Sequence, residues 1–129
     1  MARRVVNPTA ALTFPGMSQL VVDDDLAFLS GQCALDLAGR LVGEGDPEAQ
    51  VRQAFANVES LLRAGGFALA DVVKIICYVT DPDVYRAYAA VKAELFPDGG
   101  PAATTVVVAG LLDPRMLVEI DVIARHRES

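Results

Sequence analysis

The chain has 129 residues, a length typical of one domain that buries a hydrophobic core of its own. Its hydrophobic fraction is 53% with no tryptophan, and its formal net charge is −6, so a phosphate backbone would be repelled on average and no nucleic-acid partner is expected. No apolar run approaches the roughly 18 residues of a membrane span, and the first residues lack the apolar segment of a signal peptide. We therefore expect a cytoplasmic protein without a membrane partner.

The first third predicts an irregular arm followed by strands. Residues 1–17 carry two prolines and little periodicity, whereas 18–22 and 26–34 are apolar runs around the turn Asp23-Asp24-Asp25. Three acids could suggest a cation site, but consecutive side chains in a tight turn diverge, which favours a hairpin. A second turn at 36–40 precedes a short strand at 41–42.

Two helices are predicted by their caps. Asp46 before Pro47 and Asp81 before Pro82 each combine an N-cap acceptor with proline at the first helical position. The first helix should end at Gly65-Gly66, with Arg52, Gln53, Asn57 and Glu59 solvated beside its apolar stripe. The second should bury Tyr85, Tyr88, Val91 and Leu95. Between them, 72–79 reads as a nearly continuous apolar strand inside its sheet.

The last third, residues 101–124, is expected to form two strands joined by a short turn. Glu119 and Asp121 alternate with Val118, Ile120 and Val122, so the two acids should share one strand face. A carboxylate in a partly dry cleft can shuttle protons. The alternative is that one or both acids face solvent or form ion pairs across an interface.

These elements predict an α+β fold in one domain, 1–129, with helices covering one sheet face. The other face also carries Val and Ile, and subunit association is its simplest cover. The chain has no phosphate loop, no His/Cys metal spacing and no nucleophile elbow, so no cofactor and no metal are predicted. His126, the single histidine, should be exposed.

The two cysteines, Cys33 and Cys77, each lie in a predicted strand. A disulfide between them stays open, but free thiols are favoured, which fits a reducing compartment. A reactive Cys33 would need a neighbouring cation to lower its pKa. The sequence offers none beside it, so a buried thiol is predicted.

From about Ser18 to Arg125 the chain resembles the RidA/YjgF family of reactive-intermediate deaminases. Each matching block is weak alone, and their order and spacing together are specific. The blocks are Leu29-Ser30-Gly31-Gln32, the helix with Gln50, Arg52, Gln53, Asn57 and Val58, Ala64-Gly65-Gly66, Asp71-Val-Val-Lys74, Tyr78-Val79-Thr80-Asp81, Pro101-Ala102 and 117–124.

The resemblance implies a chorismate-mutase-like fold assembled as a homotrimeric barrel, with helices outside and ligand clefts between subunits. Active members hydrolyse enamine or imine intermediates to 2-oxo acids and ammonia. Carried over by position, Glu119 matches the glutamate that handles water, and Ser30 with Gly31 matches the cleft wall. Met17 replaces a tyrosine usual in the cleft, and Thr105 replaces a common cysteine.

The family's substrate-binding arginine does not carry over, because Ala103 stands in its place. A guanidinium grips a carboxylate through two charge-assisted hydrogen bonds, whereas a methyl group offers none. The resemblance therefore implies a small, uncharged or partly apolar ligand in place of 2-aminoacrylate. Whether Arg86, Arg115 or a neighbouring subunit supplies another cation stays open.

Two functions stay open, and a third is disfavoured. The first is hydrolysis or tautomerisation of an imine or enamine, with Glu119 as the catalytic residue and Ser30, Gly31, Ala103, Thr105 and Met17 around the ligand. The second is a non-catalytic metabolite-binding or chaperone-like module. A ribonuclease or translation inhibitor is disfavoured by the net charge of −6.

Overall fold

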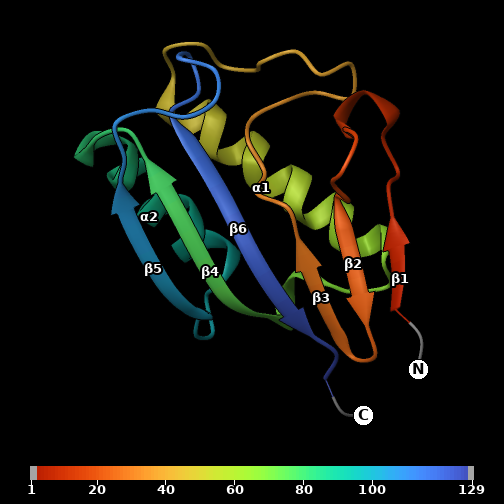
Figure 1. Cartoon of the computed structure of the whole chain (residues 1–129). Helices are drawn as coiled ribbons and strands as arrows, with labels where there is room; N and C mark the ends of the chain where they lie inside the picture. Colours follow the sequence, from red (N-terminus) through yellow and green to blue (C-terminus); the bar gives the residue numbers. More distant parts are fainter. Residues whose placement is uncertain (1–2, 128–129) are drawn as a thin grey trace.

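The fold is a six-stranded sheet with two helices packed on one of its faces (Figure 1). The structure is a computed structural model and describes residues 3–127. Its strands are β1 (Arg3–Val6), β2 (Leu20–Asp23), β3 (Leu26–Leu29), β4 (Val72–Val79), β5 (Ala102–Val107) and β6 (Val118–Arg125), and its helices are α1 (Pro47–Ala64) and α2 (Pro82–Leu95). Short 3-10 turns occupy Ala10–Leu12 and Leu69–Asp71. This confirms the predicted α+β class.

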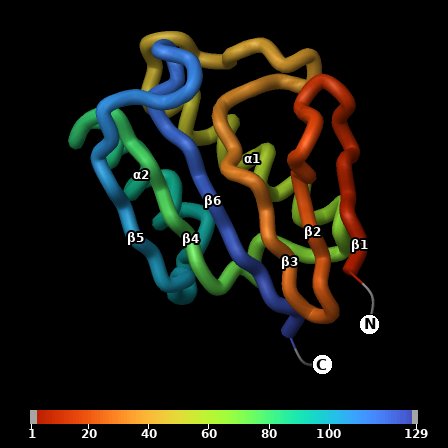
Figure 2. Tube along the Cα trace, in the orientation of Figure 1, coloured from red at the N-terminus to blue at the C-terminus, as the bar shows by residue number. Residues whose placement is uncertain are grey.

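The strand order is β1-β2-β3-β6-β4-β5, so β4 lies between the two last strands of the chain. β6 runs antiparallel to β4, while β5 runs parallel to it. The expectation of two strands joined by a short turn is therefore wrong. The connection, residues 108–117, crosses the end of β4 and meets the segment 30–45 at the same end of the sheet (Figure 2).

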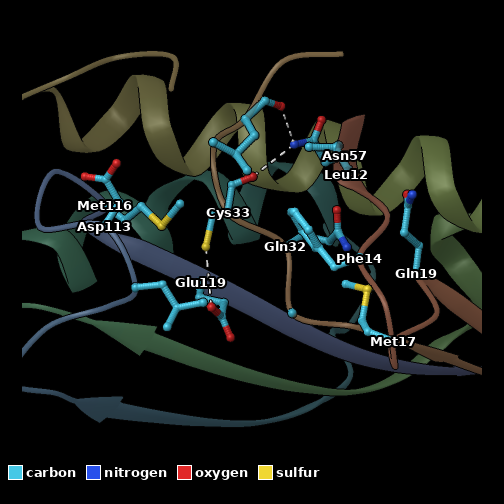
Figure 3. Close-up of a pocket in the computed structure, with 13 residues that line it drawn as sticks. Leu12, Phe14, Met17, Gln19, Gln32, Cys33, Asn57, Asp113, Met116 and Glu119 are labelled. Atoms are coloured by element: carbon cyan, nitrogen blue, oxygen red, sulfur yellow. Dashed lines mark hydrogen bonds between the residues drawn. The ribbon is translucent and has the colours of Figure 1, made fainter. Parts of the chain in front are cut away.

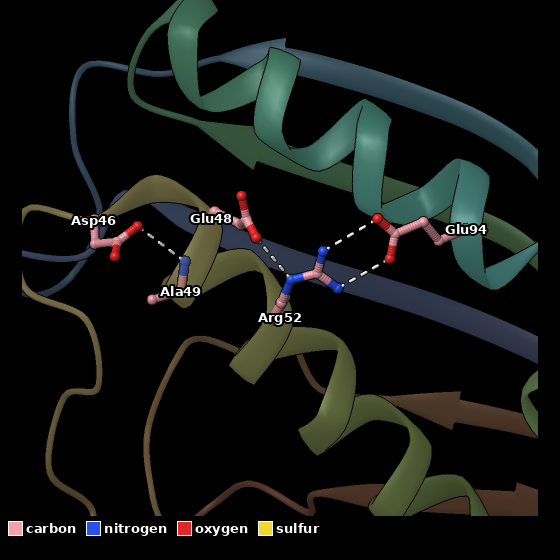
Figure 4. A network of polar contacts seen from close by, with 5 residues as sticks. All are labelled: Asp46, Glu48, Ala49, Arg52 and Glu94. Carbon is pink, nitrogen blue, oxygen red and sulfur yellow. Dashed lines mark hydrogen bonds and ion pairs between the residues drawn. The ribbon is translucent and has the colours of Figure 1, made fainter.

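The core lies between the helices and the sheet, and the helix caps form as predicted. Asp46 accepts a hydrogen bond from the backbone of Ala49, and Asp81 accepts from those of Asp83 and Val84. Gly66, at φ 89°, ends α1 in the left-handed region where a Cβ is disfavoured. Arg52 of α1 joins the helices through two hydrogen bonds to Glu94 of α2, at 3.0 and 3.1 Å (Figure 4).

Four predicted elements differ in detail. Part of the expected arm is β1, because Val5 and Val6 pair with β2 although the local pattern is weak. β3 ends at Leu29, and the expected strand at 41–42 shrinks to a single bridge between Leu35 and Leu41. In α2, Tyr88 and Val91 are buried as predicted, but Tyr85 and Leu95 are exposed. Tyr85 borders a cavity beside β5, and Leu95 is the last residue of α2, so neither side chain is fully covered.

On the sheet face away from the helices, several apolar side chains are covered by no helix or strand of residues 3–127 (Figure 1). Phe28 and Ile123 pair across β3 and β6 on this face, and Val21 pairs with Phe28 from β2. Phe28 is 40% exposed and Val106, on β5, is 39% exposed. Within residues 3–127, no helix is long and apolar enough to cross a membrane.

Candidate functional site

A cavity of about 470 Å³ opens where the connecting segments meet the sheet. Its walls come from the arm before β2, the segment after β3, the middle of α1, the loop before β6 and β6 itself (Figure 3). The lining residues are Leu12, Phe14, Met17, Gln19, Gly31, Gln32, Cys33, Leu35, Asn57, Leu112, Asp113, Met116 and Glu119. Most of the lining surface is apolar, so the cavity suits a small organic molecule with few polar groups.

Glu119 reaches this cavity because its neighbour on β6 is fixed. The backbone of Ile120 exchanges two hydrogen bonds with that of Gln32, at 2.8 and 2.9 Å, which holds the segment after β3 beside β6. Gly31 then stands directly against the carboxylate: a Cβ at Gly31 would lie 2.7 Å from Cδ of Glu119. The missing side chain at position 31 therefore makes the room in which the carboxylate lies.

Cys33 is the second polar group beside Glu119. Its Sγ lies 3.4 Å from Oε1 of Glu119 and donates to it (Figure 3). Burial first, and then the charge and hydrogen bond of Glu119, raise the pKa of Cys33 to about 12. The thiol is thus a protonated donor to the carboxylate and not an activated nucleophile. The thiol of Cys33, expected to be buried, is only partly buried at the cavity, whereas Cys77 is buried in β4, and both are free.

Amide side chains of α1 hold the segment that carries Cys33. Nδ2 of Asn57 donates to the backbone oxygens of Cys33 and Leu35, at 2.9 and 2.8 Å. Nε2 of Gln53 donates to Oδ1 of Asn57 at 2.9 Å. The prediction that Gln53 and Asn57 are solvated is wrong for both, because the chain returns over this face of α1.

Gln50 fixes the other wall of the cavity, although it was predicted only as part of a family motif. Its side chain is fully buried. Nε2 donates to the backbone oxygens of Gly43 and Arg115, at 3.1 and 3.0 Å, and Oε1 accepts from the backbone of Leu117 at 2.9 Å. These bonds hold Leu117, which lies just before the first residue of β6 and two residues before Glu119. The spacing of 50, 53 and 57 was the available signal, since it places three amides on one helix face.

The cavity brings together three of the predicted site residues, Met17, Gly31 and Glu119. Ser30 lies next to it, but its hydroxyl is turned away and donates to the backbone oxygen of Ser18 at 2.6 Å. Ala103 and Thr105 lie elsewhere. They pair with the helix-facing residues of β4 and line a second cavity, of about 420 Å³, beside α2. Within one chain they therefore do not face Glu119.

The remaining candidate groups lie outside the cavity or are already paired. Asp121 is on the open sheet face, where burial raises its pKa above the ordinary 3.8. Arg115 is held by both carboxylate oxygens of Asp113, at 3.1 and 2.7 Å, and Arg86 is paired with Asp83 on the exposed side of α2. His126, just after β6, is exposed and stacks on Phe67 with ring centroids 3.8 Å apart. In the described part of the chain, no three His, Cys, Asp or Glu side chains are placed to hold a metal ion.

Comparison with known proteins agrees with this architecture. The family model described as Endoribonuclease L-PSP matches residues 8–126. A RutC family protein of Sulfurisphaera tokodaii is 34% identical over 107 residues, which cover 82% of this chain and 84% of that protein.

Two crystal structures match almost the whole chain. One is YyfA of Yersinia pestis, a protein of unknown function in the conserved Rid family, with a TM-score of 0.87, 29% identity and coverage of 97% of this chain and 100% of that one. The other is a Mycobacterium tuberculosis member of the YjgF/YER057c/UK114 family, with a TM-score of 0.82, 30% identity and coverage of 97% and 100%. With its matching fold and sequence, the chain belongs to the Endoribonuclease L-PSP family, the RidA/YjgF group of proteins.

Proposed function

We propose that the protein is a homotrimer that binds a small, partly apolar metabolite in clefts between its subunits and hydrolyses or tautomerises an imine or enamine there. One observation carries the proposal: the carboxylate of Glu119 opens into an apolar cavity and is held there by Gly31 and Cys33. A fixed carboxylate among apolar walls can orient a water molecule and accept its proton.

The chemistry needs only water and Glu119 as a base. Water adds to the imine carbon while one of its protons passes through the carboxylate to the nitrogen, giving a neutral tetrahedral carbinolamine. The carboxylate then carries the hydroxyl proton of the carbinolamine to the same nitrogen, the C–N bond breaks, and ammonia leaves a carbonyl product. For an enamine, protonation at the β-carbon first gives the imine. Met17 and Met116 would hold the apolar part of the ligand.

The open sheet face supports the homotrimer. An apolar face with Phe28 at 40% exposure is expected to be covered by other copies of the chain. In such an assembly the cavity of Ala103 and Thr105 would complete the cleft at Glu119 of a neighbouring subunit. This arrangement would give those two residues the ligand contact that one chain does not provide.

The usual small substrate, 2-aminoacrylate, is expected to be poor, because Ala103 offers no guanidinium for its carboxylate. Without the guanidinium the substrate is no longer positioned. Such positioning lowers the activation free energy by several kcal/mol in comparable sites, which is on the order of 100-fold or more in rate. We also propose no ribonuclease role, because the net charge of −6 opposes binding of a phosphate backbone.

Ammonia release tests the proposal directly. Purified protein would be added to 2-aminoacrylate, and to the imines that an amino-acid oxidase produces from leucine and methionine. We expect faster ammonia release from the larger imines, a loss of at least about 100-fold with Glu119→Gln, and little turnover of 2-aminoacrylate. Equal rates for wild type and Glu119→Gln on every imine would favour the non-catalytic binding module instead.

Molar mass in solution tests the assembly. The wild type should have three times the chain mass by light scattering. Phe28→Lys places a charge on the open face and should release monomers. Leu37→Lys is the matched control, since Leu37 is 76% exposed in a surface turn. A monomeric wild type would contradict the proposed clefts.

A further inference from the structure

The second cavity lies between one side of α2 and the helix-facing side of β5. It is lined by Pro82, Tyr85, Lys92, Ala103, Thr105 and Val107, and its volume is about 420 Å³. Ala103 and Thr105 pair with Ile75 and Cys77, whose side chains are buried under the helices. Both β5 side chains therefore point to the side of the sheet on which α2 lies. Apart from Lys92 and the hydroxyls of Thr105 and Tyr85, the lining is apolar.

Lys92 is the only cation that lines this cavity, and among residues 3–127 it has no carboxylate within ion-pair distance. Its Nζ lies 5.1 Å from the centroid of the Tyr88 ring, one helical turn before it. A cation–π contact of this kind holds the ammonium in place without neutralising it. The charge stays available to a ligand.

The acids nearest in sequence to the cavity's edge are already engaged. Asp81 accepts two backbone hydrogen bonds at the start of α2, and Asp83 is paired with Arg86. Glu94, two residues after Lys92, holds both ends of the Arg52 guanidinium. A negative group entering the cavity would thus meet one free ammonium, and the neighbouring carboxylates are turned to partners of their own.

We propose that Lys92 and the hydroxyl of Thr105 bind the carboxylate of a monoanionic ligand whose apolar part extends away from them. This assignment rests on the proposed function, since in the homotrimer the cavity would adjoin Glu119 of a neighbouring subunit. One ammonium and one hydroxyl match a single negative charge, whereas a phosphate dianion would be left with too few donors. The ligand class is a small carboxylic acid with an apolar side chain.

Lys92 would replace the charge of the absent arginine but not its geometry. An ammonium is a point charge on a flexible stem, while a guanidinium forms a rigid fork with two parallel hydrogen bonds. The carboxylate would be attracted without being oriented, so orientation must come from the apolar body of the ligand. This predicts a preference for acids with large side chains over two- or three-carbon acids.

The test compares two probes that differ in charge, 4-methyl-2-oxopentanoate and its methyl ester, by NMR titration of the assembled protein. We expect the wild type to bind the acid at least about tenfold more tightly than the ester. Lys92→Gln should lose that preference and keep its affinity for the ester, and Lys92→Arg should restore it. Arg86→Gln is the matched control, because it removes one positive charge from the same helix at a position outside the cavity. This variant should behave as the wild type.

Equal wild-type affinities for acid and ester, or a preference that survives in Lys92→Gln, would refute the role of Lys92 and would leave the proposed cleft unaffected. Failure of the wild type to bind either probe would refute both this assignment and the proposed cleft. Molar mass and thermal unfolding of each variant show that the comparison is made on folded, equally assembled protein.

Discussion

Replacing Glu119 by glutamine should make the thiol of Cys33 easier to ionise. The pKa of Cys33 is raised from 9.0 to about 12, by burial first and then by the charge and hydrogen bond of Glu119. Glutamine keeps the size of the side chain and removes its charge, so the part of the rise due to Glu119 is lost while burial remains. Because burial is the largest of three causes, the thiolate population should grow by at most about 100-fold.

Alkylation by iodoacetamide measures this change without any knowledge of the ligand. The rate at Cys33 would be followed by peptide mass spectrometry from about pH 7 to about pH 10, where only the thiolate reacts. Cys77 is an internal reference, since burial and not Glu119 raises its pKa to about 12.

Glu59→Gln is the matched control on α1, where Glu59 pairs with Arg63 at 3.6 Å. The Glu119 variant should react faster at Cys33 only, by a factor between a few-fold and about 100-fold. An unchanged pH profile at Cys33 would show that thiol and carboxylate are not in contact and would refute this geometry of the cavity.

Three further changes probe the cavity and the sheet. Gly31→Ala should displace the Glu119 carboxylate by roughly 1 Å and lower imine turnover about 100-fold, with thermal stability almost unchanged. Gly110→Ala is its control, because no atom lies within 4 Å of the added Cβ. Gln50→Leu should lower the free energy of unfolding by about 3 kcal/mol, measured by urea at fixed protein concentration, because three partly buried backbone groups lose their partner. Asp121 has a pKa raised by burial, so the folded chain holds this proton more tightly than the unfolded chain does. Wild-type stability should therefore gain as pH falls through the folded pKa towards 3.8, and Asp121→Asn should lack this gain in thermal melts at several pH values.

Local chemistry made the helices and the hairpin predictable. Asp46-Pro47 and Asp81-Pro82 act on backbone groups within a few residues, and the turn at Asp24 needs only its own positive φ of 54°. The alternation along β6 also appears as predicted, with Val118, Ile120 and Val122 buried. Family membership, carried by the order of the motif blocks, is likewise confirmed by the match over residues 8–126.

Contacts between residues that are distant in sequence could not be predicted from the sequence. Gln50 bonds to Arg115 and Leu117, 65 and 67 residues away, so the spacing of the amides on α1 could place them on one helix face but could not identify their partners. The same holds for Asn57, whose partners are at Cys33 and Leu35. A polar side chain on a helix is predicted to be solvated unless the chain that returns over it is known. Here the returning chain is the wall of the candidate site.

Whether Glu119 and the β5 residues lie on the same sheet face depends on the register between strands. The periodicity within a single strand does not reveal that register. Tyr78 of β4 pairs with Glu119 on one side and with Val106 on the other, so the β5 residue level with Glu119 on its own face is Val106. Thr105 must then point to the opposite face, because side chains alternate along a strand. No rotamer change within one chain carries both groups to one ligand across a packed sheet. A site that uses Glu119 together with Thr105 therefore requires two copies of the chain, with the open face of one sheet turned so that its cavity meets the β5 edge of the next.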